Sequence, residues 1–99
     1  MTACSGGSRD TSAMQKTIQL GSYDNAGLSV VWVPGFELTV KVSGAQVLIH
    51  GNGAGLLSLA QYLATLAEPS VPFGVHLHLD EHNSLEPGSA ELVLERRDQ

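Results

Sequence analysis

In the stretch GNGAGLLSLAQYLATL, residues 51–66, apolar side chains begin to recur at intervals of three and four residues, as they do on one side of an α-helix. Asn52 is a favourable N-cap residue, and Pro69 and Pro72 end the helical pattern on the other side. We therefore predict one helix over residues 54–68. Its apolar stripe is formed by Leu56, Leu59, Ala60, Leu63 and Leu66, and is widened by Leu57 and Tyr62.

The segments on both sides of this helix have the pattern of short β-strands. Residues 36–42 alternate most clearly, because Leu38 and Val40 fall on one face while Glu37 and Thr39 fall on the other. The remaining strand-like segments are residues 17–23, 28–33, 46–50, 74–80 and 90–96.

The order of these segments predicts the fold class. Strands joined by two to four residues are antiparallel neighbours, since a parallel crossover needs about a dozen residues or more. One helix covers only one face of a sheet. We predict an α+β fold: an antiparallel sheet of about six strands with one helix packed on one face, in the order four strands, one helix, two strands.

Composition limits the domain organisation and the location. Residues 1–15 are rich in Ser, Thr and Gly and lack an apolar period, so we predict a disordered N-terminal leader followed by a single α+β domain over residues 16–97. The single cysteine, Cys4, forms no internal disulfide, which makes a cytoplasmic location the expectation. Apolar runs are far shorter than the ~20 residues of a membrane span, so no membrane association is expected.

The charge balance limits the class of partner. Ten acidic residues against five basic ones give a net charge of −5. This argues against a protein that binds nucleic acid through its phosphates. It is compatible with a partner that presents a basic surface.

Ionisable residues are concentrated in GVHLHLDEH, residues 74–82. On a strand, Val75, Leu77 and Leu79 point together toward the helix, and the histidines point to the opposite, open face. We predict that this open face is a recognition surface for a partner. Its members are Glu37, Thr39, His76, His78, Asp80 and Glu81.

A metal site is the alternative interpretation of this stretch. His76 and His78 are separated by one residue, so both rings leave one face of a strand and could ligate zinc. His82 is the favoured third ligand, and Asp80 or His50 could serve in its place. Glu81 interrupts the H-x-H-x-D-H motif of metallo-β-lactamases, and the cupin motif needs a glutamate further from the second histidine.

Catalysis has less support in the sequence. A metal-dependent or acid/base hydrolase could use His76, His78 and Asp80 or His82, because histidine titrates near neutrality. Neither Ser58 nor Cys4, however, has a sequence context that activates a nucleophile. We expect no enzyme, no catalytic residue and no cofactor, with zinc as the alternative.

The glycines of residues 51–55 stand between a strand and a helix, where phosphate-binding loops also lie. The Lys-Ser/Thr of a P-loop and the spacing G-x-G-x-x-G are both absent. We therefore interpret these glycines as residues that turn the chain onto the helix.

Two runs of the chain resemble the immunity protein 32 family, a small bacterial family associated with polymorphic toxin systems. They are VLIHGNGAGLLSLAQYLATLA, residues 47–67, and HLHLDEHNSLEPGSAELVLER, residues 76–96. The resemblance rests on Gly51-Asn52, Gly55-Leu56, the helix over residues 57–67, His76, His78, Asp80, Gly88-Ser89 and Glu91-Leu92. It departs from the family pattern at Gly53-Ala54, where a charged residue such as Glu is expected.

The resemblance implies a non-catalytic α+β protein that occludes a cognate toxin in the cytoplasm of the producing cell. Many such toxins are nucleases with basic active-site surfaces, against which an acidic protein docks rapidly. A third possibility, from the half-covered sheet, is a homodimer that pairs through the uncovered face or an edge strand.

Overall fold

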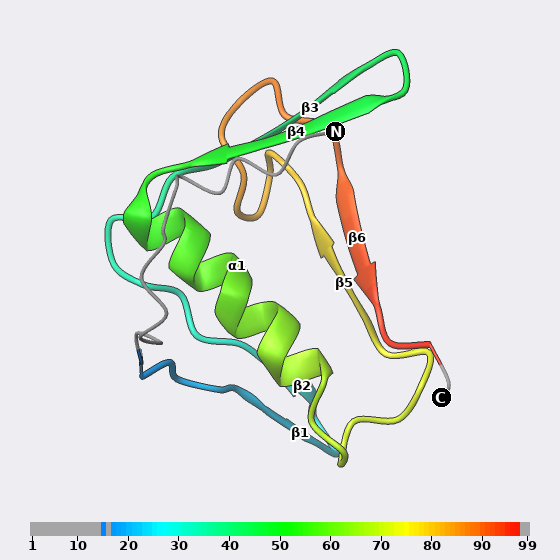
Figure 1. Ribbon diagram of the computed structural model, residues 1–99. Coiled ribbons are helices and arrows are strands. Elements are labelled where there is room, and N and C mark those ends of the chain that lie inside the picture. Colours follow the sequence, from blue (N-terminus) through cyan, green and yellow to red (C-terminus); the bar gives the residue numbers. More distant parts are fainter. Residues whose placement is uncertain (1–14, 16, 98–99) are drawn as a thin grey trace.

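The computed structural model describes residues 15 and 17–97 of the chain. The elements are β1 (Ser22–Asp24), β2 (Gly27–Ser29), β3 (Leu38–Ser43), β4 (Gln46–Gly51), α1 (Gly53–Leu66), β5 (His76–Leu79) and β6 (Leu92–Glu95), shown in Figure 1. They confirm the predicted α+β class and the order of four strands, one helix and two strands. The predicted leader, residues 1–15, lies outside the described residues except for Gln15.

The prediction of one sheet with about six strands is wrong. The strands of the described residues form three separate two-stranded antiparallel sheets, β1–β2, β3–β4 and β5–β6. At β3, the edge away from β4 is occupied by a loop: Glu86 N donates to Leu38 O at 2.9 Å, and Ala90 N donates to Val40 O at 2.8 Å. Gly88 turns the chain within this loop at a φ of 86°, and its N–H donates to Glu81 Oε1 at 2.9 Å rather than to β3, so the loop does not continue as a strand.

A row of buried polar side chains on α1 keeps the N-terminal segments out of a larger sheet. Ser58 and Thr65 belong to this row and lie buried on one face of the helix. Gly21 N donates to Thr65 Oγ1 at 2.9 Å, and Val33 N donates to Ser58 Oγ at 2.9 Å. These backbone groups therefore bond to the helix instead of to a neighbouring strand.

Gln61 completes the row and joins two segments to the helix. Its Oε1 accepts from Gln19 N at 2.8 Å, and its Nε2 donates to Val31 O at 3.1 Å. Strands were predicted over residues 17–23 and 28–33, and these ranges only overlap the three-residue strands β1 and β2.

The core lies where α1, β3 and β5 meet. It is a cluster of six buried side chains: Leu38, Val40, Leu59, Tyr62, Leu79 and Leu85. The Trp32 ring meets Tyr62 edge-on with 4.4 Å between centroids and stacks on Phe36 at 4.0 Å. Leu79 is buried and Leu77 packs against the cluster, which confirms the inward face predicted for residues 74–80.

β4 is exposed along almost its whole length. Every residue from Gln46 to His50 is exposed. The hairpin β3–β4 extends past the start of α1, so the helix covers only the end of the hairpin at which β4 leads into α1 (Figure 1). Val42 and Val47, near the tip, therefore have no covering layer among the described residues. Within those residues, no helix is long and apolar enough to cross a membrane.

Candidate functional site

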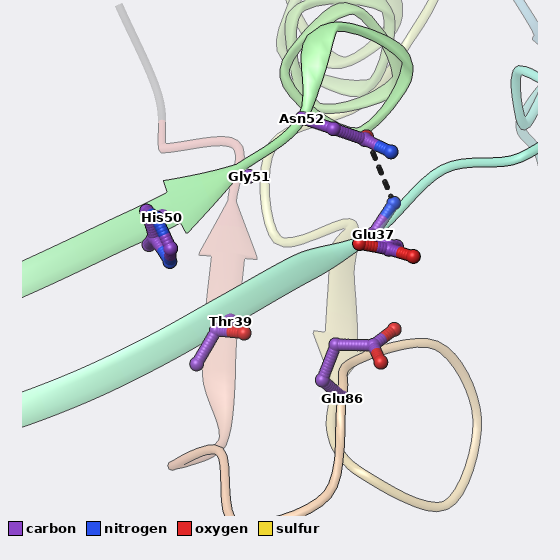
Figure 2. A pocket seen from close by; sticks show the side chains of 6 residues that line it. All are labelled: Glu37, Thr39, His50, Gly51, Asn52 and Glu86. Carbon is purple, nitrogen blue, oxygen red and sulfur yellow. Dashed lines mark hydrogen bonds between the residues drawn. The ribbon is translucent and has the colours of Figure 1, made fainter.

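A pocket of about 250 Å³ opens where the β3–β4 hairpin meets the start of α1 (Figure 2). Thr39 stands opposite His50 in the hairpin, on the face away from the buried Val40. The pocket thus belongs to the outer face of the hairpin. Its lining residues are Glu37, Thr39, His50, Gly51, Asn52 and Glu86.

Asn52 fixes the geometry of this pocket. Its Oδ1 accepts from Gly55 N at 2.7 Å, which confirms the predicted N-cap of the helix, and also from Glu37 N at 3.0 Å (Figure 2). Its Nδ2 donates to Gly35 O at 2.9 Å. One side chain therefore joins the start of the helix to the segment that leads into β3.

Two glycines allow these segments to approach closely. A Cβ built at Gly55 would lie 2.0 Å from Glu37 O, and one at Gly51 would lie 2.8 Å from the same atom. Neither residue can carry a side chain unless the backbone moves. This contact supports the interpretation that the glycines of residues 51–55 serve the turn onto the helix.

The pocket carries two carboxylates that have no ion-pair partner among the described residues. Glu37 and Glu86 both line it, and Figure 2 shows their carboxylates beside β3, with His50 on the β4 side. In the described part of the chain, no Lys, Arg or His forms an ion pair with either carboxylate. The pocket is therefore suited to a cationic group from outside the chain.

The face of β5–β6 that carries the histidines has a different organisation. His76 and His78 are exposed, with their ring centroids 4.9 Å apart. His76 Nδ1 lies 2.9 Å from Gly74 O, and His78 Nδ1 lies 2.8 Å from Glu91 Oε2. The sequence reasoning missed Glu91 as a partner of His78. Pairing residues 74–80 with 90–96 as antiparallel strands would have placed it on the same face.

Asp80 and Glu81 mainly hold the loop that follows β5. Asp80 Oδ1 accepts from His82 N at 2.8 Å and from Asn83 N at 3.1 Å. Glu81 Oε1 accepts from Gly88 N at 2.9 Å, which ties together the two ends of this loop. His82 is exposed, with its Nε2 3.9 Å from Glu81 Oε2.

The structure divides the predicted recognition face over two sheets and a loop. Glu37 and Thr39 lie on the hairpin side, His76 and His78 lie on β5, and residues 80–82 follow in the loop. The described residues contain no group of three or more His, Cys, Asp and Glu side chains that could hold a metal ion. The pocket residues Asn52 and Glu86 were not among the predicted site residues.

The comparisons with known proteins give one match. The model of the family described as immunity protein 32 matches residues 46–97, from the start of β4 to beyond the end of β6. No curated protein and no solved structure matches the chain. Since the family match covers more than half of the 99 residues, the chain belongs to the immunity protein 32 family.

Proposed function

We propose that this protein binds a cognate toxin in the cytoplasm and blocks it by occlusion, without catalysis. The family supports an immunity function. The observation that supports a particular binding site is the pocket lined by Glu37 and Glu86. The two carboxylates have no cationic partner among the described residues.

A lysine or arginine side chain of the toxin fits the chemistry of this pocket. Carboxylates form charge-assisted hydrogen bonds with ammonium and guanidinium groups, and these bonds strengthen as the partner surface excludes water. The backbone of Glu37 is already held by Asn52, so on binding only the side chain has to be ordered at this position. The net charge of −5 would also raise the rate of encounter with a basic toxin.

The β5–β6 side contributes the rest of the proposed recognition surface. His76 and His78 are exposed there, and Asp80 and Glu81 lie at the loop that follows. We assign these residues to additional contacts on the β5–β6 side, apart from the pocket, where the exposed histidine rings offer polar contacts.

The test is a pull-down and titration against the product of the neighbouring toxin-like reading frame, purified in an inactivated form. Replacing both pocket carboxylates, Glu37→Gln with Glu86→Gln, removes charge and keeps side-chain volume. We expect about 10- to 100-fold weaker binding, as for the loss of charged partners that become desolvated in an interface. Glu68→Gln is the control, since Glu68 lies just after α1, outside the pocket. Equal binding by both variants would remove the pocket from the proposal, and no binding by the unmodified chain would refute toxin binding.

The histidine pair supports a second candidate function, zinc binding, in which His76 and His78 supply two ligands and the others come from outside the described residues. Because the Gly74 carbonyl can only accept, His76 Nδ1 donates to it, and in the neutral ring this leaves Nε2 with the lone pair that a metal would need. Glu91 imposes the same arrangement on His78. Histidines that ligate metals are oriented by such bonds to a carbonyl or carboxylate.

Elemental analysis of protein purified without a histidine tag tests this second candidate. Stoichiometric zinc that is lost in both His76→Ala and His78→Ala would support it. His50→Ala is the control, because His50 lies on the other sheet and should leave the zinc content unchanged. A protein that contains no zinc and takes up none on titration would refute it.

A further inference from the structure

The free edge of β4 has the properties of a surface that pairs with another strand. β4 bonds to β3 on one side, and nothing among the described residues pairs with its other side. Natural edge strands are usually protected by charged side chains, proline or a bulge. Residues 46–51 contain no Lys, Arg, Asp, Glu or Pro, and the register with β3 runs without interruption.

The register shows which backbone groups face this free edge. Leu38 O and Val40 O accept hydrogen bonds from the loop on the far side of β3. The backbone N–H and C=O groups of these two residues therefore point away from β4. Their partners Gly51 and Ile49 consequently direct their own N–H and C=O groups away from β3. With a period of two, Val47 does the same.

The side chains of the hairpin add exposed apolar surface on both faces. Val42, Val47 and Leu48 are 60%, 57% and 53% exposed. Val42 and Val47 share the inner face, while Leu48 stands on the outer face opposite Lys41. Single exposed apolar residues are ordinary on a protein surface, but these three lie within seven residues of one hairpin, and two of them are on β4 itself.

The distribution of charge identifies the occupant. Residues 38–51 contain none of the ten acidic residues of the chain, and their only full charge is Lys41. Two copies with a net charge of −5 each repel one another elsewhere, so this segment without acidic residues is where they can meet at the lowest electrostatic cost. A basic toxin, by contrast, is attracted to the acidic parts of the chain.

We propose that the free edge of β4 pairs with β4 of a second copy of this chain, antiparallel about a two-fold axis at Leu48. Val47 then lies opposite Ile49 of the second copy, and the two outward-facing residues exchange both backbone hydrogen bonds. The two-fold axis repeats this pair. Leu48 meets Leu48 at the axis, and Gln46 lies opposite His50.

The proposed interface is small. A pair of six-residue strands buries less than the roughly 800 Å² per partner of a standard interface. We therefore expect a dimer with a dissociation constant in the micromolar range. This dimer does not depend on toxin binding.

Sedimentation velocity of the full chain over micromolar concentrations measures the dimer directly. Leu48→Lys places two charges at the axis and should shift the equilibrium fully to monomer. Val93→Lys is the matched control: Val93 is 45% exposed but lies on β6, so its replacement should leave the dimer intact. A monomeric unmodified chain, or a dimer that survives Leu48→Lys, would overturn the proposal.

Cysteine cross-linking tests the register. In a Cys4→Ser background, Leu48→Cys meets itself across a pair without hydrogen bonds, where Cα atoms about 4.5 Å apart permit a disulfide. Gln46→Cys, on the same strand and face, is about 13 Å from its own copy and should not cross-link. Equal cross-linking at both positions contradicts this register. A monomeric chain whose Val47 and Ile49 amides resist hydrogen exchange would mean that another part of this chain covers the edge, and would also overturn the proposal.

Discussion

Replacing Gly55 by alanine should destabilise the fold more than its size suggests. The new Cβ would lie 2.0 Å from Glu37 O and 2.8 Å from the Glu37 carbonyl carbon. Both are backbone atoms, so no side-chain rotation relieves the overlap. Either the start of α1 or the segment before β3 must move, and the hydrogen bonds that Asn52 makes to Gly55 N and Glu37 N are then weakened.

The magnitude follows from three contributions. Overpacking at a rigid site costs about 1–3 kcal/mol, and a weakened N-cap adds about 1 kcal/mol. Alanine in a helix recovers up to about 1 kcal/mol relative to glycine. The expected net loss is about 2 kcal/mol, which lowers the Tm of a domain of this size by about 8–16 °C.

Gly53→Ala provides the matched control. Gly53 lies in the same turn of α1 as Gly55, but a Cβ at Gly53 would have no atom within 4 Å. It should be neutral or stabilise the chain by up to about 1 kcal/mol. Urea and thermal unfolding, followed by far-UV circular dichroism, measure both variants. Equal stability of Gly55→Ala and Gly53→Ala would refute the reasoning, since only the contact with Glu37 distinguishes them.

Substitutions at three other positions have definite expected outcomes in urea unfolding. Asn52→Ala should cost about 1–2 kcal/mol, while Asn52→Asp keeps the acceptor oxygen and should lose clearly less; equal losses would contradict the role of Oδ1. Gln61→Leu leaves the Gln19 N–H and the Val31 carbonyl unpaired and should cost about 2 kcal/mol, so a neutral result would refute the bonding row on α1. Tyr62→Phe should not destabilise at neutral pH, because the buried hydroxyl has no hydrogen-bond partner among the described residues. Burial also raises the pKa of Tyr62 far above its ordinary value. Above about pH 10 the Tyr62 hydroxyl therefore ionises in the unfolded chain but not in the folded one, and the free energy of unfolding falls as the pH rises. Unfolding measured at several alkaline pH values should show a smaller fall for Tyr62→Phe, and an unchanged fall would contradict the burial argument.

Local patterns in the sequence predicted the local features of the fold. The apolar period and Asn52 located α1 and its start, because both depend on residues within a few positions of one another. Alternation predicted that Leu79 faces the core, since the two faces of a strand follow from its backbone geometry alone.

The division into three sheets could not be predicted in this way. It depends on Ser58, Gln61 and Thr65 bonding backbone groups 25 to 44 residues away. The periodicity of the sequence shows only that these helix positions are polar. Polar helix positions usually face solvent, so nothing in the pattern indicates that these three are buried. Alternation also cannot show whether a face is covered, and every residue of β4 from Gln46 to His50 is exposed.

The candidate site was predicted in part. The pattern of residues 36–42 placed Glu37 and Thr39 on an outward face, and both line the pocket. Glu86 reaches the same pocket through a loop that returns to β3, a contact between residues far apart in the sequence. The division of the strands into separate sheets likewise separated His76 and His78 from the pocket side.

The most direct test of the proposed function is survival of cells that express the neighbouring toxin-like gene. Co-expression of this chain should restore growth, and the double variant Glu37→Gln with Glu86→Gln should restore it much less at equal protein levels. Cell death despite abundant, folded protein would contradict the claim that this chain gives immunity against that toxin.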